Sequence, residues 1–317
     1  MNKFKKYLKS SNTFVLLLFF YGFSSIFSCQ QENSYVLKLP AGFPEMAIPE
    51  DNALTELRVS LGKSLFFDPI LSVDTSISCA SCHIPEYAFA DTVALSIGVH
   101  GQPGLRNTPS LLNVGYHPRL MRDGGVPTLE MQVLAPVGDL SEMGFNVRLL
   151  VERLAEHPTY GPLMDKAYGR KDAFALTRAL GAYQRTLLDG TVPENLSEPE
   201  QRGKAVFELH CSSCHNGFDY TNHEIVNVGL WETYAPDSGY ARITRKAEDS
   251  GKFKTPSLRN ANHTAPYMHD GSLMTLEEVV EFFNDGGKPH RNKDPRIKPL
   301  GLTDEEKSEL VSYLKVL

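Results

Sequence analysis

The 317-residue sequence has no long basic run after its first residues, and its formal net charge is -6. Proteins that bind nucleic acids need clustered Lys and Arg side chains, so we expect no nucleic-acid partner. Segments that alternate like β-strands are scarce, and the sequence has a single tryptophan, Trp231. What remains is a chain of two-domain length, built from helical patterns and long loops.

A hydrophobic run long enough to cross a bilayer is also missing. Residues 13–27, TFVLLLFFYGFSSIF, fall short of the about 20 apolar residues that a membrane span requires. Positive charge precedes this run, at Lys3, Lys5, Lys6 and Lys9. The pattern predicts a secretion signal rather than a transmembrane anchor, and therefore export from the cytoplasm.

The number of cysteines is odd, because the chain has five. In an exported protein paired cysteines usually form disulfides, so the odd cysteine needs an explanation. Cys29 ends the sequence SIFSC, which resembles a lipoprotein processing box, and the polar QQENS after it suits a tether. We therefore expect a lipoprotein-type signal peptide over residues 1–29 and a periplasmic protein anchored to a membrane through a lipid on Cys29.

Residues 62–136 are rich in Gly, Pro and Asn, and they show no sustained helical period. Apolar residues at three- and four-residue spacing then predict helices over 146–157 and 173–188. Ser197 with Glu200 makes a capping box, and this pattern recurs at Thr275 and Thr303. We place the boundary between two domains there, with an N-terminal domain over 30–195 and a C-terminal domain over 196–317.

The remaining four cysteines lie in two Cys-x-x-Cys-His motifs, within SCASCHIPEYAFAD and HCSSCHNG. The motif residues are Cys79, Cys82 and His83, and then Cys211, Cys214 and His215. In such a motif the two thiols can add to the vinyl groups of a haem, and the histidine lies under the iron as its proximal ligand. A haem would also give the loop-rich segment an apolar body to pack around.

Other uses of these cysteines are a dithiol redox pair, a zinc site or local disulfides. A redox pair does not need the adjacent histidine, and a four-thiolate zinc site would leave both histidines unexplained. We therefore predict a mainly α protein with long loops and two cytochrome c-like domains, each built around one covalent c-type haem.

Many ordered segments of residues 61–317 resemble the bacterial di-haem cytochrome c peroxidase family, including its relatives that oxidise protein side chains. They include LGKSLFFDPILSVDTSISCASCH, GVHGQPGLRNTPSLLN, LEMQVLAPVGDLSEMG and FKTPSLRNANHTAPYMHDGSLMTLEEVVEFF. The resemblance implies reduction of hydrogen peroxide at the N-terminal haem. Electrons would enter at the C-terminal haem from a small donor, a c-type cytochrome or a cupredoxin. Family members commonly dimerise, so a homodimer is one expectation.

Three residues acquire roles at the N-terminal haem through this resemblance. His100 matches a histidine that, in many members, is the sixth iron ligand until the other haem is reduced. Glu142 matches the distal glutamate, which suits a proton acceptor and donor for peroxide cleavage. Gln132 matches the glutamine that orients peroxide. Without the resemblance, His100 reads as a solvated loop residue and Glu142 as a surface charge.

The resemblance also implies calcium between the domains. Its ligands would be the Asn107 side chain and the backbone carbonyls of Thr264 and Pro266, with waters. Oxygen ligands suit this hard cation. The plainer interpretation is that RNTPS and HTAPY are turns.

The sequence departs from the family at two positions. Arg122 replaces the tryptophan that often lies between the haems, so Tyr116, Tyr267 or direct transfer would carry electrons. Phe283 replaces the methionine or tyrosine that ligates the C-terminal iron, which leaves that iron five-coordinate or bound by Met268 or His269.

These departures keep two other functions open beside the peroxidase. One is a peroxide-dependent oxidase of protein side chains or small molecules. The other is a non-catalytic electron carrier or peroxide sensor.

Overall fold

The structure is a computed structural model, and it describes residues 33–191 and 193–317. The predicted signal peptide and Cys29 lie outside these residues, so export and lipid anchoring stay predictions. Within the described ranges, no helix combines the length and the apolar character needed to span a membrane.

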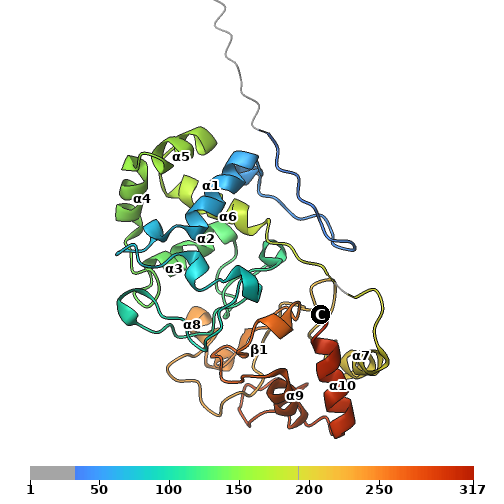
Figure 1. The fold of residues 1–317 in the computed structure, drawn as a ribbon. Coiled ribbons are helices and arrows are strands. Elements are labelled where there is room, and N and C mark those ends of the chain that lie inside the picture. Colours follow the sequence, from blue (N-terminus) through green and yellow to red (C-terminus); the bar gives the residue numbers. More distant parts are fainter. Residues whose placement is uncertain (1–32, 192) are drawn as a thin grey trace, which may run out of the picture. The chain divides into compact units, whose positions relative to one another are not determined.

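The N-terminal half, residues 33–191, is built from six α-helices (Figure 1). They are α1 (Glu56–Phe67), α2 (Leu129–Gln132), α3 (Leu134–Gly138), α4 (Val147–Glu156), α5 (Tyr160–Tyr168) and α6 (Ala173–Gln184). The helices predicted over 146–157 and 173–188 are α4 and α6, although α6 ends at Gln184. The segment predicted as loop is mostly loop with short 3₁₀ turns, but α1 extends into it and α2 lies near its end.

The C-terminal half, residues 193–317, contains α7 (Glu198–His210), α8 (Ala241–Thr244), α9 (Leu276–Asn284) and α10 (Asp304–Leu314). The three predicted capping boxes begin α7, α9 and α10. Strands β1 (Ile225–Val226) and β2 (Phe253–Lys254) pair antiparallel, with Ile225 opposite Lys254. The described chain is therefore mainly helical, as predicted.

Each half is closed by an equivalent pair of packed helices. In the first, α1 crosses α6 at Gly62, where an added Cβ would lie 1.9 Å from the Ala179 carbonyl oxygen. In the second, α7 crosses α10 at Gly203, where a Cβ would lie 1.9 Å from the Glu309 carbonyl oxygen. In both halves a glycine lets the helix before the Cys-x-x-Cys-His motif approach the closing helix.

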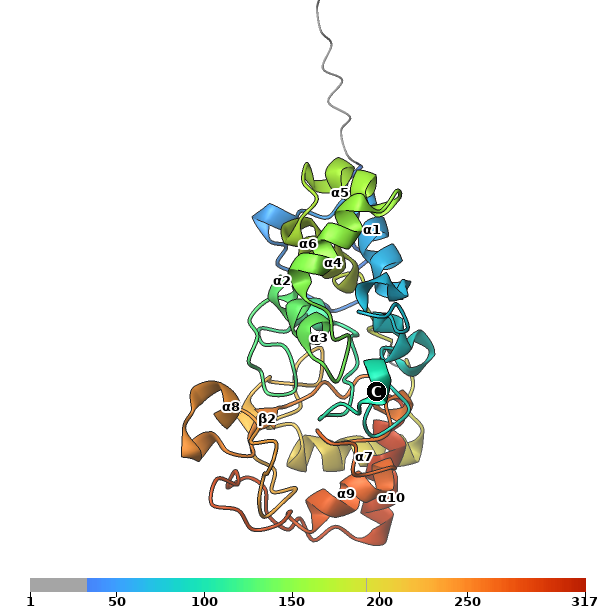
Figure 2. The ribbon, with the colours of Figure 1, turned by 90° about the vertical axis from the view of Figure 1, so that its left-hand side faces the viewer.

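Each half has its own hydrophobic core. One core gathers residues from 57–187 and the other residues from 196–317. The predicted boundary falls between the two cores, and the division into domains stays a prediction. In Figure 2 the helices α1–α6 occupy one end of this part of the chain, and α7, α9 and α10 the other.

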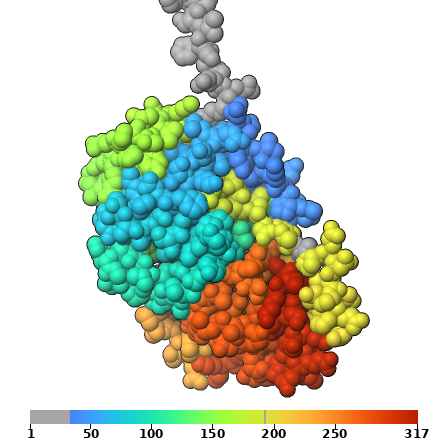
Figure 3. All heavy atoms as spheres, viewed as in Figure 1, coloured from blue at the N-terminus to red at the C-terminus, as the bar shows by residue number. Residues whose placement is uncertain are grey.

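The two halves are in direct contact, as Figure 3 shows for one face. The Arg106 guanidinium donates through Nε and Nη2 to both carboxylate oxygens of Asp237, at 2.6 and 2.7 Å. Its Nη1 donates to Asp123 at 2.7 Å. A bidentate pair this well buried fixes orientation as well as distance. These bonds hold the loops on which the candidate site residues lie.

Candidate functional site

The first motif forms a tight turn. A 3₁₀ helix spans Cys79–Ser81, and the backbone N–H of His83 donates to the Cys79 carbonyl at 2.9 Å. The His83 ring is half-buried, and its Nδ1 lies 2.9 Å from the Phe89 carbonyl oxygen. Burial lowers the pKa of this imidazole. A neutral ring that donates from Nδ1 has Nε2 available for a metal.

The second motif follows the end of α7 and repeats this geometry. The backbone N–H of His215 donates to the Cys211 carbonyl at 2.9 Å, and His215 Nδ1 lies 3.1 Å from the Tyr220 carbonyl oxygen. Burial lowers the pKa of His215 to about 4, so this ring is also neutral near pH 7.

Both motifs line one cavity of about 680 Å³. In the described chain the four motif cysteines form no disulfide, and the thiols of the two motifs do not gather into a shared metal site. Burial raises the pKa of Cys79 and Cys211 to about 12, so both side chains are neutral thiols near pH 7. Free thiols and oriented imidazoles in an apolar cavity fit two covalent haems.

Glu142 and Gln132 line the same cavity. The Glu142 loop follows α3 and packs against residues 98–99, where Val99 N–H donates to the Glu142 carbonyl at 2.8 Å. This approach requires Gly98, because an added Cβ would lie 2.1 Å from the Ser141 carbonyl oxygen. Burial raises the pKa of Glu142 to about 7, and the nearby Asp139 carboxylate adds to the shift. A carboxyl of this pKa can both accept and donate a proton near neutral pH.

His100 does not join this group. It lies in a 3₁₀ turn at φ +60°, its side chain is exposed, and it is not among the residues that line the cavity. The predicted role as a sixth iron ligand would require the 99–101 turn to move inward. That role stays a prediction.

The corresponding side of the C-terminal motif is different. Phe283 of α9 lines the cavity there, together with Met268 and His269. The His269 ring stacks on Phe253 with centroids 3.8 Å apart. Phe283, at the predicted ligand position, therefore has no atom that can bind iron. The Met268 thioether and the His269 imidazole lie in the same cavity wall.

Arg122 occupies the neighbourhood expected for calcium. Its Nη2 donates to the Asn107 side-chain oxygen at 2.5 Å, and its Nε donates to the Asn107 backbone carbonyl at 3.1 Å. Thr264 and Pro266 line the same cavity. A calcium ion on Asn107 would have to displace the half-buried Arg122 guanidinium, so these residues as arranged do not fit calcium. Calcium ligation stays a prediction.

The aromatic residues considered for electron transfer lie in separate places. Tyr116 packs edge-on against Phe43 and Phe218, with centroids 5.7 and 5.0 Å away, and so contacts both halves. Tyr267 lines the cavity and donates to the Ala261 carbonyl at 2.9 Å. Trp231 is partly exposed, and its indole donates to Asp270 at 2.8 Å.

Sequence reasoning missed two groups of polar residues between the halves. One is the Arg106 network described above. The other brings together His117, Asp219 and His223. Their sequence separations are long and irregular, so no local motif pointed to them.

Comparison with known protein families agrees with this geometry. Residues 56–201 match the model for di-haem cytochrome c peroxidase, and residues 200–317 match the model for cytochrome c. The chain is 36% identical to cytochrome-c peroxidase IdrP1 of Denitromonas iodatirespirans, over 86% of this chain and 85% of that protein. It is 34% identical to methylamine utilization protein MauG of Methylorubrum extorquens, over 85% and 80%.

Solved structures show the same fold. A MauG-like protein associated with microbial copper homeostasis superposes with a TM-score of 0.84 at 31% identity, over 90% of this chain and 95% of that one. The diheme peroxidase BthA from Burkholderia thailandensis superposes with a TM-score of 0.73 at 24% identity, over 90% and 95%. Matches of this extent imply covalent haems in c-type domains. The chain belongs to the di-haem cytochrome c peroxidase family.

Proposed function

We propose that this protein reduces hydrogen peroxide to water with electrons from a small redox protein, a c-type cytochrome or a cupredoxin. The observation that carries the proposal is Glu142, a half-buried carboxyl whose pKa is raised to about 7 in the cavity that both motifs line. Each turnover would combine one hydrogen peroxide, two electrons and two protons to give two waters.

The N-terminal half would perform the chemistry. A haem on Cys79, Cys82 and His83 supplies the iron at which peroxide reacts. A Glu142 carboxylate oxygen takes the proton from one peroxide oxygen and returns it to the other, which leaves as water. Gln132 holds peroxide in position through its side-chain amide, and the apolar cavity wall excludes bulk water.

The C-terminal half would receive the electrons. Cys211, Cys214 and His215 would hold its haem, and the Tyr220 carbonyl would keep the His215 ring oriented. A thioether ligand raises haem potential, so a phenyl ring at position 283 favours a low potential at this entry point.

That expectation supports a second candidate function. A peroxide-dependent oxidase would draw electrons from a protein or small molecule instead of a soluble donor. Phe283 and Arg122, which replace the family's ligand and relay residues, favour this candidate, and so does the 34% identity to MauG.

The test is Glu142→Gln in the haem-loaded protein, with Glu86→Gln as the control. Glu86 is exposed and lies three residues beyond His83. We expect peroxide turnover to fall about 10²-fold or more in the first variant and to stay unchanged in the second, with the haem spectra of both unaltered. Unchanged turnover in Glu142→Gln would contradict the proposal.

The donor separates the two candidates. Sustained peroxide consumption with a reduced c-type cytochrome as sole donor supports the peroxidase. Reaction with peroxide in a single turnover, continued only when an oxidisable side chain is supplied, supports the oxidase.

A further inference from the structure

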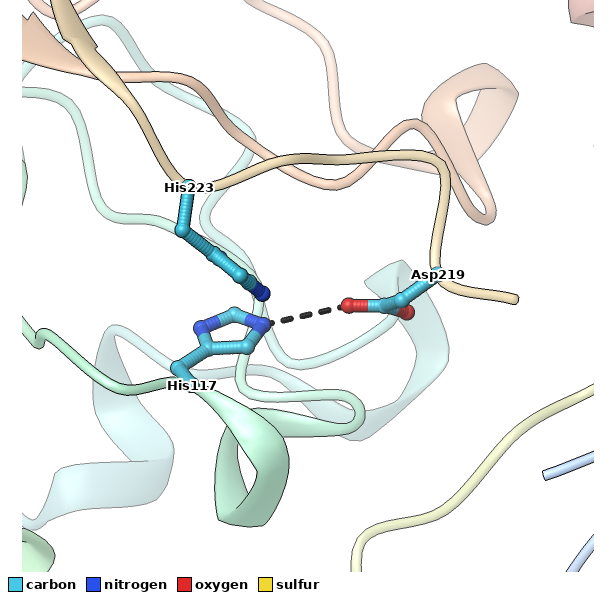
Figure 4. A group of neighbouring side chains, drawn as sticks. All are labelled: His117, Asp219 and His223. Carbon is cyan, nitrogen blue, oxygen red and sulfur yellow. Dashed lines mark hydrogen bonds and ion pairs between the residues drawn. The ribbon is translucent and has the colours of Figure 1, made fainter. Parts of the chain in front are cut away.

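Three metal-ligating side chains meet between the halves, apart from both Cys-x-x-Cys-His motifs. His117 comes from the N-terminal half, and Asp219 and His223 come from the loop after the second motif (Figure 4). The ligand atoms of the three side chains all lie within 4.8 Å of one another, and no other such group of His, Cys, Asp or Glu side chains occurs among the described residues. The proposed peroxide chemistry uses none of them.

The three side chains converge on one point. His117 Nε2 lies 3.2 Å from Asp219 Oδ2, and the rings of His117 and His223 have centroids 4.7 Å apart. Figure 4 shows a nitrogen of His223 directed toward the other two groups. Ligand atoms of a tetrahedral zinc lie about 3.4 Å apart, given zinc–ligand distances of about 2.0–2.2 Å. The three ligand atoms lie within 4.8 Å of one another, so a small inward movement of the side chains would reach that spacing.

The Asp219 carboxylate is oriented by donors on its other side. Its Oδ1 accepts from Asn113 Nδ2 at 2.8 Å and from Ser257 Oγ at 3.2 Å. The side chain is 2% exposed. These bonds leave Oδ2 facing the two imidazoles. In known metal sites, hydrogen bonds from neighbouring residues orient the ligand side chains in the same way.

His223 supplies a second, independent sign of a missing partner. Its Nδ1 is buried and makes no hydrogen bond to any described residue. An imidazole nitrogen buried without a partner costs free energy that a bound metal or water would recover. Burial lowers the pKa of His223 to about 4 and also lowers that of His117, so both rings are neutral ligands near pH 7.

Two positively charged side chains lie close to this cluster and limit its affinity for a metal ion. Arg259 Nε lies 3.9 Å from Asp219 Oδ1, but it donates to the Phe218 carbonyl at 2.8 Å. Lys254 lies near both histidines, and burial lowers its pKa to about 8. Its positive charge opposes a divalent ion near neutral pH.

We propose that His117, Asp219 and His223 bind a divalent transition-metal ion that joins the two halves of the chain. Two imidazoles and one carboxylate form a donor set that suits zinc, and three protein ligands leave a fourth position for water. The loop that carries His223 is hydrogen-bonded to the second motif, because Asn222 N–H donates to the Cys214 carbonyl at 2.9 Å. The ion would therefore stiffen the C-terminal haem site against the N-terminal half.

The experiment uses the haem-loaded protein, stripped with EDTA and titrated with zinc chloride by calorimetry. Bound zinc is then counted against haem iron after gel filtration. We expect one zinc per chain in the wild type and at least about 10-fold weaker binding in His223→Ala. His263→Ala, which removes an exposed histidine elsewhere in the C-terminal half, is the control and should bind as the wild type does.

Two results would overturn the proposal. One is the absence of stoichiometric zinc in the wild type, which would leave the cluster as a hydrogen-bonded contact. The other is equal zinc binding by wild type and His223→Ala, which would place the ion elsewhere. Should His223→Ala fail to fold, anomalous diffraction from zinc-soaked wild-type crystals gives the same decision: a zinc peak between His117 and His223 supports the site, and a peak elsewhere refutes it.

Discussion

The two halves of this chain share one way of holding a haem and differ in what faces it. In each, a helix precedes the Cys-x-x-Cys-His motif, a backbone carbonyl orients the histidine, and a glycine lets the closing helix approach. The differences lie in the cavity walls. Glu142 lies near enough to Cys79 and Cys82 of the first motif to act electrostatically on both thiols, whereas Phe283 takes the predicted ligand position of the second half.

This contrast teaches that the shared parts attach and orient the cofactor, and that the remaining wall decides its use. A carboxyl with a pKa near 7 permits proton transfer in one half. In the other, we propose that Phe283, a ring without donor atoms, lowers the haem potential through the loss of an axial ligand. The predictions below test whether chemistry and electron entry are divided in this way.

The largest effect should come from pH. If the Glu142 carboxylate is the proton acceptor, its ionised fraction rises about tenfold per pH unit below the pKa of about 7 and levels off above it. The rate of reaction with peroxide should follow, rising about 50-fold from about pH 5 to about pH 7, where half of the carboxyl groups are ionised. Stopped-flow spectroscopy of the wild type and Glu142→Gln checks this. A rise of equal size in the variant would assign the titration to another group.

The glycine crossings test the part that the halves share. Gly62→Ala and Gly203→Ala would each drive a Cβ into a backbone carbonyl at 1.9 Å. Each should lower the free energy of unfolding by about 1–3 kcal/mol, since helix backbones cannot yield as side chains do. Differential scanning calorimetry measures the loss. Gly138→Ala, with no neighbour within 4 Å, is the control and should be close to neutral. A loss of stability in only one of the two variants would show that the two helix crossings are not equivalent.

The potential of the C-terminal haem tests the part that differs. Phe283→Met should supply a thioether and raise that potential, within the range of about 0.8 V that axial ligands span. Spectroelectrochemistry should find the N-terminal haem unchanged. The control is Phe282→Met, because the neighbouring ring does not line the cavity. An unchanged potential in Phe283→Met would mean that another residue, such as Met268, already ligates the iron.

Much of this comparison was predictable from sequence, because the features concerned are local. Capping boxes at Ser197, Thr275 and Thr303 start the helices where expected. The two Cys-x-x-Cys-His turns also depend on residues next to one another. The end of α1 was missed, because its run Leu65, Phe66 and Phe67 is apolar throughout although only the first two are buried, so the sequence shows no clear helical face there.

What escaped prediction depends on residues far apart in the chain. Arg106 and Asp237 are separated by 131 positions, and His117 and Asp219 by 102. Single-sequence patterns carry no record of such pairs, since the fold alone brings them together. His100 shows the opposite case. Its motif indicated a ligand, but whether the turn points inward depends on tertiary packing that the motif does not contain.

The smallest expected effect is that of calcium on the stability of the wild type. This experiment tests the contacts between the two halves. The Arg122 guanidinium already holds the Asn107 side-chain oxygen, and the Arg122 backbone carbonyl accepts from Lys254 N–H at 2.8 Å, so Arg122 itself contacts both halves. Adding calcium should therefore leave the unfolding temperature of the wild type unchanged. In Arg122→Leu the Asn107 oxygen is released. Calcium at about 100 times its dissociation constant should then stabilise the variant by about 2.7 kcal/mol. Calcium stabilisation of the wild type by a similar amount would show that the guanidinium gives way to the ion, and that the halves are joined as the family resemblance implies.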